Sequence, residues 1–299
     1  MEVATPLAEY GGSTQAVQYH YDISGDFYRL WLDPSMTYSC ALWDLDDPGE
    51  ALHAAQERKI AFHLDAARAL RADRVLDIGC GWGGLLHAAS ARGRARQLVG
   101  LTLSKDQAAH VRAMSLPGVD VRLESWTHHA PAAPYDSIIS VGAFEHFAKP
   151  EDTVEEKIAV YRDFFQRCAG WLTRDGRMSL QTIAYGTMKR EEASEFINNE
   201  IFPSADLPTL EEILRAAEGV MEISLVRNDR PHYARTFAAW AENLRRRRDE
   251  AQAMVGEQVT RRYERYLTQS SLGFMMGKIG LLRLALRPIA RKWSTIAKP

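Results

Sequence analysis

The chain has 299 residues, of which 46% are hydrophobic and 25% are charged, and its formal net charge is -2 at pH 7. This ordinary globular composition supplies enough apolar material for one large α/β domain or one domain with a lid. Because the charges nearly balance, there is no overall basic field, and we expect no nucleic-acid partner.

The N-terminal segment MEVATPLAEYGG has neither the basic region nor the apolar region of a signal peptide, and no apolar run is long enough to span a bilayer. The cysteines, Cys40, Cys80 and Cys168, are widely spaced and form no CxxC pair, which disfavours a disulfide framework and a structural zinc site. We therefore expect a cytoplasmic protein.

An aromatic segment extends to about Trp43, and from about Asp73 to Ile183 short β-like runs alternate with helical stretches. This alternation is typical of a parallel sheet wrapped by helices. The predicted strands are RVLDIG, QLVGLTL, VDVRL, YDSIISVG and GRMSLQTI. The predicted crossover helices are GGLLHAASAR, KDQAAHVRAM and EKIAVYRDFFQRCAGWL, in which apolar residues recur every three or four positions.

An insertion from about Tyr185 to Pro208 and a C-terminal third that begins helical follow this core. Near the end, leucines at 282, 284 and 286 alternate with Arg283, Ala285 and Arg287, which favours an amphipathic strand that completes the sheet. The alternative is a membrane-surface helix, because apolar residues between 274 and 279 stand among basic ones.

The run VLDIGCGWGG places Gly79, Gly81 and Gly84 at GxGxxG spacing directly after a predicted strand, so backbone amides can approach a nucleotide cofactor. NAD binding requires an acidic residue about twenty residues further on, but the second strand ends in GLTLS. Asp77, at the end of the first strand, would repel a pyrophosphate, whereas it suits the ammonium and sulfonium groups of S-adenosylmethionine. The residues therefore favour the methyl donor.

Several segments occur in the order seen in one known family: HYDISGDFYRLWLDPSMTYSCALW, VLDIGCGWGG, GLTLSKDQ, SVGAFEHF, EIFPSADLPT, HYARTFAAWAENL and RRYERYLT. Only the glycine loop is generic to methyltransferases, whereas YSCALW, GLTLSKDQ and GAFEHF are specific. Over most of its length the chain thus resembles the cyclopropane fatty acid synthase and mycolic acid cyclopropane synthase family of S-adenosylmethionine-dependent methyltransferases.

The resemblance implies a Rossmann-like class I methyltransferase fold, with a mostly parallel seven-stranded sheet, helices on both faces and an α-helical lid. Within one domain, residues 1–299, it implies an N-terminal helical lid at 1–60 and a cofactor-binding core at 61–184. Residues 185–299 would form the acceptor-binding insertion and the C-terminal part of the sheet.

The resemblance also implies a set of cofactor-binding residues, which Asp77 joins on the charge argument above. Thr102 and Gln107 would supply polar contacts where the ribose-binding acid is missing, and Trp126 would pack near the adenine. The set carried over from the family is Tyr38, Ser39, Gly79, Gly81, Thr102, Leu103, Gln107 and Trp126.

A sulfonium methyl is already a strong electrophile, so the protein has to orient an electron-rich acceptor and exclude water, and no metal is required. If the acceptor is an alkene, transfer leaves a carbocation that aromatic faces stabilise. The candidate wall residues are Tyr21, Phe27, Trp31, Tyr38, Phe144, Phe147, Phe202, Tyr233 and Trp240.

In the resembled family a bound bicarbonate removes the proton from this cation, held by residues matching Cys40, Glu145 and Tyr233 and by a histidine. Gln181 stands at the histidine position and cannot carry the imidazole's charge, which weakens the anion site and leaves bicarbonate doubtful. A buried Glu145 with a raised pKa can itself be the base, and His146 is the other candidate. We interpret Cys40 as a pocket wall or anion contact, because methyl transfer needs no nucleophilic cysteine.

A second departure from the family lies in GFMMGKIGLLR, where Lys278 and Gly280 stand at positions that usually carry a tyrosine and an acid. It indicates an altered acceptor pocket or a different fate for the cation. For an isoprenyl diphosphate acceptor, Arg230, His232 and Arg235 are candidate phosphate contacts.

The sequence therefore predicts C-methylation of an unsaturated, largely apolar small molecule or acyl chain, such as a fatty acyl or isoprenoid alkene, with methylation or cyclopropanation as the outcome. The alternative is N- or C-methylation of a small specialised metabolite without bicarbonate. A scaffold without catalysis is disfavoured by the intact GAFEHF and HYA segments. Transient contact with a membrane surface or a carrier protein, and a homo-oligomer, remain open.

Overall fold

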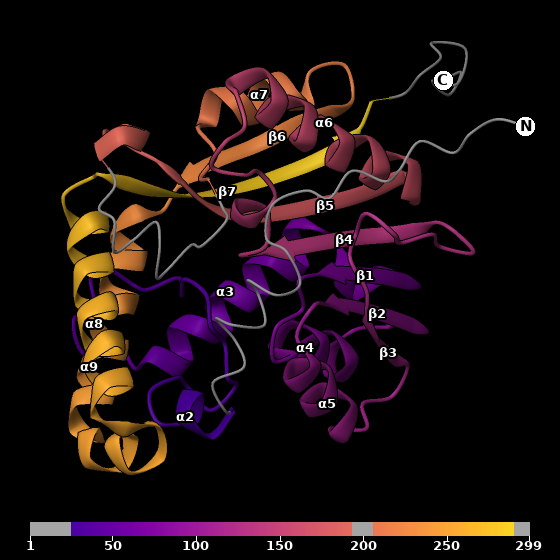
Figure 1. The fold of residues 1–299 in the computed structure, drawn as a ribbon. Coiled ribbons are helices and arrows are strands. Elements are labelled where there is room, and N and C mark those ends of the chain that lie inside the picture. The colour runs from indigo at the N-terminus through magenta and orange to yellow at the C-terminus, as the bar shows by residue number, and fades with distance from the viewer. Residues whose placement is uncertain (1–24, 193–205, 290–299) are drawn as a thin grey trace, which may run out of the picture.

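A seven-stranded sheet forms the centre of the computed structural model, which describes residues 25–192 and 206–289 (Figure 1). The strand order is β3-β2-β1-β4-β5-β7-β6. The parallel part consists of β1 (Arg74–Ile78), β2 (Gln97–Thr102), β3 (Val119–Leu123), β4 (Tyr135–Val141) and β5 (Leu172–Tyr185). Strand β7 (Ile279–Pro288) is antiparallel to both β5 and β6 (Met221–Asn228). The mostly parallel seven-stranded sheet predicted above is confirmed.

The predicted strands of the alternating core are all present, and the leucine-rich run near residue 284 is β7. A membrane-surface helix there is wrong, because Leu284 lies in register with Leu180 and Val226, and both β5 and β6 pair with the run. Strand β6 was not predicted from its residues. It lies at the edge of the sheet, and its exposed Leu225 and Val226 break the alternation that marks a half-buried strand.

Helices cover both faces of the sheet (Figure 1). On one face α3 (Leu52–Ala66), α4 (Gly84–Arg92) and α5 (Lys105–Ala113) bury Ile60, Leu86 and Val111 against the strands. On the other face α6 (Val154–Trp171) and α7 (Leu210–Ala217) complete a separate core. Both begin with a capping box, which satisfies the first free amides of each helix.

A helical unit stands at one end of the sheet, where α8 (Arg230–Arg246) packs against α9 (Arg248–Met275), and α2 (Gly25–Arg29) contacts α9 (Figure 1). Gly256 interrupts α9 with a positive φ of 81°. Between these helices and the sheet lies a set of aromatic side chains that we call the lid cluster. It comprises Phe27, Tyr28, Trp31, Tyr38, Trp82, Tyr233, Phe237, Trp240, Tyr263, Tyr266 and Phe274.

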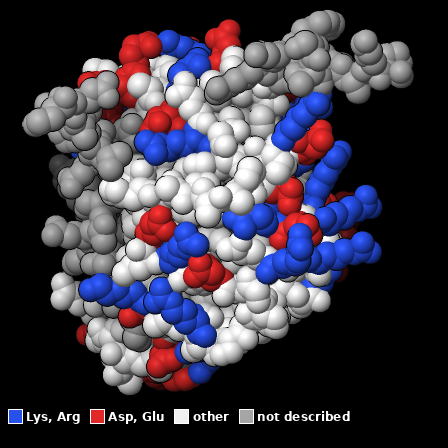
Figure 2. Space-filling model, turned by 90° about the vertical axis from the view of Figure 1, so that its right-hand side faces the viewer, with Lys and Arg blue, Asp and Glu red and all other residues white. Residues whose placement is uncertain are grey.

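Acidic and basic side chains are interspersed on the face shown in Figure 2. Ion pairs at the protein surface include those of Arg92 with Glu57 and of Arg96 with Asp73. Within the described residues no helix combines the length and apolarity needed to cross a membrane. The predicted wall residues Tyr21 and Phe202 lie outside the described residues.

Candidate active site

Several of the predicted site residues lie at or just after the carboxyl ends of neighbouring strands. Ile78 of β1 is in register with Leu101 of β2 and with Ser140 of β4, so the three strands end side by side. Asp77 stands at the end of β1 and Glu145 lies in a short helical turn (Phe144–His146) directly after β4. This edge is where open α/β sheets bind their ligands.

The glycine loop after β1 is held to β2 and leaves space beside it. The amides of Gly79 and Cys80 both donate to the carbonyl of Leu101 at 2.9 Å. Gly79 has a φ of 78°, and a Cβ there would stand 2.6 Å from the Cβ of Ala143. A Cβ on Gly81 would meet no atom within 4 Å. Gly79 therefore allows the close approach of the turn that follows β4, and Gly81 borders open space.

Asp77 is an unsatisfied acid at the edge of this space. Its side chain is 2% exposed, and its Oδ1 has no hydrogen-bond partner. Desolvation raises the pKa of Asp77 to about 7, which the positive charge of Lys59 opposes. A buried acceptor without a donor needs an explanation. A cationic group of a bound cofactor would provide the missing partner, so the residues fit the ammonium of S-adenosylmethionine.

The polar residues predicted after β2 form a bonded pair. The Thr102 hydroxyl donates to Gln107 Oε1 at 2.7 Å, and both side chains are buried. Leu103 is half-buried between them in the chain. Trp126 is buried against Phe147, with ring centroids 5.0 Å apart. The structure thus places the pair beside β1, while Trp126 is also part of the core that α6 covers.

Tyr38, Ser39 and Cys40 lie on a buried segment, residues 37–43, that has no regular secondary structure. From α3, Gln56 Nε2 donates to the carbonyl of Ser39 at 2.9 Å, and Lys59 Nζ donates to the Ser39 hydroxyl at 2.9 Å. Burial, reinforced by Arg283, lowers the pKa of Lys59 to about 8. Lys59 was missed by the sequence analysis, because one lysine in a helix carries no signal of its burial.

Glu145 is a buried carboxyl beside the lid cluster. It is 4% exposed and accepts from the Thr182 hydroxyl at 3.1 Å and from the Ile183 amide at 3.4 Å. Desolvation raises the pKa of Glu145 to about 7, although these hydrogen bonds oppose the shift. Its charge also raises the pKa of Tyr266 in the lid cluster, after desolvation of that phenol. At neutral pH Glu145 can therefore either accept or donate a proton.

The other candidate acid–base groups differ from Glu145. Desolvation lowers the pKa of His146 to about 4, so this imidazole is neutral. Burial raises the pKa of the Cys40 thiol to about 12, and the thiol donates to the Ala41 carbonyl at 3.1 Å. These properties suit a pocket wall rather than a nucleophile. Tyr233 packs in the lid cluster, 4.6 Å between centroids from Phe274.

Gln181 is part of a buried hydrogen-bond network. Its Oε1 lies 2.9 Å from Arg283 Nε and 3.2 Å from His63 Nε2. Burial lowers the pKa of His63 well below its usual value, so the ring is neutral. Its Nε2 must then carry the proton that reaches Gln181, while Nδ1 accepts from the Ser179 hydroxyl at 2.8 Å. These donors fix the orientation of the amide.

Arg283 lies directly opposite Gln181 in the pairing of β5 with β7. Sequence alternation assigned it to the polar face of an amphipathic strand, but this expectation is wrong, since Arg283 is fully buried. Segment 37–43 covers this face at residue 283, whereas Arg287 stays exposed and pairs with Glu222. Neither Arg283 nor His63 was recognised as a site residue.

Lys278 and Gly280, the second departure from the family pattern, differ in their exposure to solvent. Lys278 is half-exposed and lies 3.3 Å from a Glu192 carboxylate oxygen. Gly280 is buried in β7, and a Cβ there would stand 3.3 Å from the side-chain amide of Asn228. Of these two residues, only Gly280 lies in the protein interior.

Two groups of predicted contacts are corrected by the structure. Phe144 and Phe147 belong to the core that α6 covers and not to the lid cluster. The predicted phosphate contacts bind the chain itself: Arg230 donates to the Met275 carbonyl, Arg235 to the Asp44 carbonyl, and His232 accepts from the Trp43 amide.

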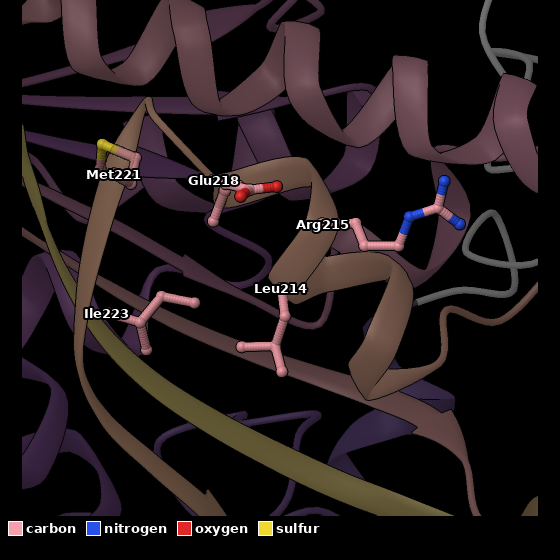
Figure 3. A pocket seen from close by; sticks show the side chains of 6 residues that line it. Leu214, Arg215, Glu218, Met221 and Ile223 are labelled. Carbon is pink, nitrogen blue, oxygen red and sulfur yellow. The ribbon is translucent and has the colours of Figure 1, made fainter.

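A separate hollow lies between α7 and β6, at the far edge of the sheet from the glycine loop (Figure 3). It contains none of the predicted site residues. Its lining consists of Leu214, Arg215, Ala217, Glu218, Met221 and Ile223.

Comparison with known proteins agrees with this arrangement. The family model described as mycolic acid cyclopropane synthetase matches residues 11–284. The cyclopropane mycolic acid synthase MmaA2 of Mycobacterium tuberculosis is 37% identical over 290 residues, covering 90% of this chain and 96% of the relative. The S-adenosylmethionine-dependent methyltransferase UmaA of the same organism is 35% identical, over 91% of this chain and 96% of its own.

Comparison with a solved structure supports the same family at the level of the fold. The structure of the mycolic acid cyclopropane synthase CmaA1 complexed with SAH and CTAB superposes with a TM-score of 0.82, at 35% identity, and covers 93% of this chain and 99% of that one. The predicted class I methyltransferase fold is thereby confirmed.

Proposed function

The chain belongs to the mycolic acid cyclopropane synthetase family and is an S-adenosylmethionine-dependent methyltransferase, and on this premise we propose that it methylates an alkene carbon of a largely apolar acceptor. The acceptor is a fatty acyl chain or an isoprenoid, and the reaction passes through a carbocation. Methylation and cyclopropanation are the two outcomes open to that cation.

One observation carries the proposal: the buried carboxyl of Glu145 lies beside the lid cluster. The cluster offers aromatic faces in a desolvated space, where each contact with a cation is worth about 1–2 kcal/mol. Tyr38 links to Tyr266 by a hydrogen bond of 3.1 Å between their hydroxyls, and Tyr266 is within electrostatic range of Glu145. A cation formed here would have both stabilising faces and a base.

We assign the cofactor to the end of β1 and the glycine loop that follows it. S-adenosylmethionine, when bound, supplies an electrophilic methyl group, and its transfer to the alkene breaks the sulfur–methyl bond and leaves the cation. Asp77 would hold the ammonium, the glycine loop would accept the nucleoside, and Thr102 with Gln107 would meet its hydroxyls. Ser39, oriented by Lys59, would contact the amino-acid end.

Glu145 removes the proton that the cation must lose. If the proton leaves the transferred methyl, the electrons of its C–H bond close a cyclopropane ring. If it leaves a neighbouring carbon, the electrons of that carbon's C–H bond form a double bond, and the product carries a methyl branch. In both cases the carboxylate becomes a carboxylic acid and later returns its proton to solvent.

The alternative is N- or C-methylation of a small specialised metabolite without bicarbonate. The hydrogen bonds of Gln181 support this alternative. Because Arg283 and His63 occupy Oε1, only the neutral amide NH2 is left to face a ligand. A neutral donor binds an anion weakly compared with an imidazolium. Bicarbonate is therefore not included in the proposed mechanism.

The test uses S-adenosylmethionine with a fully deuterated methyl group, offered dioleoylphosphatidylglycerol vesicles, geranylgeraniol and a metabolite extract. Mass spectrometry of the products counts retained deuterium. An acyl or isoprenoid product with two of three deuteriums means that the methyl lost the proton, and one with three means methyl branching. Label found only in polar metabolites would overturn the proposal in favour of the alternative. Glu145→Gln serves as the matched control for enzymatic transfer.

A further inference from the structure

The buried segment 37–43 has its main chain satisfied by side chains from distant parts of the protein. Thr236 of α8 accepts from the Ala41 amide at 3.1 Å, and His232 accepts from the Trp43 amide at 3.0 Å. Gln56 of α3 donates to the carbonyls of Thr37 and Ser39. Buried backbone groups need such partners when no helix or strand supplies them. The position of this segment is therefore decided by the side chains around it.

Arg283 is the only charged group of β7 that reaches this segment among the described contacts. Its Nη2 donates to the carbonyls of Cys40 and Ala41, each at 3.1 Å. Its Nε donates to Gln181, and its Nη1 forms an ion pair with Asp229. The fixed fork of a guanidinium can serve all these acceptors at once.

We propose that Arg283 is a positioning residue for the cofactor site: its buried guanidinium joins β7 to the carbonyls of Cys40 and Ala41 and so holds segment 37–43 against the glycine loop. The inference rests on the proposed cofactor contacts of Tyr38 and Ser39. The two parts meet closely, since a Cβ on Gly84 would stand 2.9 Å from the Thr37 hydroxyl.

The same guanidinium also orients Gln181. Arginine only donates, so the glutamine must turn its oxygen toward β7, and the donor from His63 requires the same orientation. The amide NH2 is thereby directed away from Arg283. Arg283 thus fixes both segment 37–43 and the side-chain amide of Gln181.

The experiment measures binding of S-adenosylhomocysteine by isothermal titration calorimetry on the purified full chain, well below each variant's Tm. Arg283→Lys keeps the charge next to Asp229, but a single ammonium cannot span Gln181 and two carbonyls. We expect the Kd to rise about tenfold, because the contacts to Cys40 and Ala41 are lost.

The matched control is Arg74→Lys. Arg74 also bonds a glutamine side chain, that of Gln97, and two consecutive carbonyls, those of Ala133 and Pro134, but at the opposite end of the strands. A purely structural arginine would lower the Tm in the same way without changing the Kd. We expect the control to bind S-adenosylhomocysteine within about twofold of the unmodified chain.

A second variant covers the case in which Arg283→Lys does not fold. The pair Arg283→Gln with Asp229→Asn leaves no buried charge without a partner, and it should also bind about tenfold more weakly. Equal Kd values for the folded Arg283 variant and the Arg74 control would overturn the inference. Absence of binding by the unmodified chain would instead refute the proposed cofactor site itself.

Discussion

Replacing Glu145 by glutamine should stabilise the protein at alkaline pH while slowing methyl transfer. Burial raises the pKa of Glu145 from 4.5 to about 7, which at about 1.4 kcal/mol per pKa unit makes the ionised form cost on the order of 3 kcal/mol in the folded state. Because the folded-state pKa is raised, the contribution of Glu145 to stability is fully present below about pH 4.5 and is lost as the pH rises through about 7.

The glutamine of Glu145→Gln never ionises. Its NH2 replaces the carboxylate oxygen that accepts from the Ile183 amide, and the loss of this hydrogen bond costs about 1 kcal/mol. The net gain expected at about pH 8.5 is about 2 kcal/mol, or about 4 °C in Tm. At about pH 5, where Glu145 is itself protonated, the gain should vanish. Differential scanning calorimetry at both pH values measures it.

The control for this experiment is Glu156→Gln. Glu156 is exposed in the capping box of α6, and its hydrogen bond from the Thr153 amide lowers its pKa, so its variant should follow the opposite pH trend. For activity, Glu145→Gln should lower kcat by about 10²–10⁴ and leave the Kd of S-adenosylhomocysteine within twofold. A Tm difference that is equal at both pH values, or full activity, would refute the reasoning.

Other substitutions separate the remaining roles. Asp77→Asn should weaken S-adenosylmethionine about tenfold while sparing methylthioadenosine, which has no ammonium group, and calorimetry that finds equal losses would contradict the assignment. Cys40→Ala should keep turnover within about tenfold, since the pKa of about 12 leaves the thiol protonated, and a null enzyme in the methyl-transfer assay would make Cys40 catalytic. Gln181→Met should cost about 2–4 kcal/mol in urea unfolding, because the donors of Arg283 and His63 lose their acceptor, and an unchanged midpoint would argue against the network.

The fold could be predicted from local patterns wherever those patterns reflect burial on the sheet. Strands such as β1 and β4 are buried along most of their length because helices cover both of their faces, and the glycine loop marks the turn that follows β1. The edge strand β6 escaped prediction, because one exposed stretch carries too few buried side chains to show a period.

The candidate site residues also fall into those that local sequence predicts and those that it does not. Asp77 was predicted as a candidate from its charge at the end of the first strand, and Glu145 from a motif that resembles a known family. Lys59, His63 and Arg283 were not, because their roles depend on contacts between segments far apart in the chain. No residue near Arg283 in the sequence indicates that segment 37–43 covers it.

The placement of β7 between β5 and β6 also constrains the order in which the molecule assembles. Strand β7 follows β6 in the chain, yet it must pair with β5, so Met178 meets Leu286 across more than a third of the sequence. Arg283 reaches back still further, to Cys40. Contacts of such long range form slowly, because closing a long loop costs conformational entropy before the contact stabilises anything. The parallel core can therefore collapse early, and competence to bind the methyl donor should arrive as a late, slow phase of refolding.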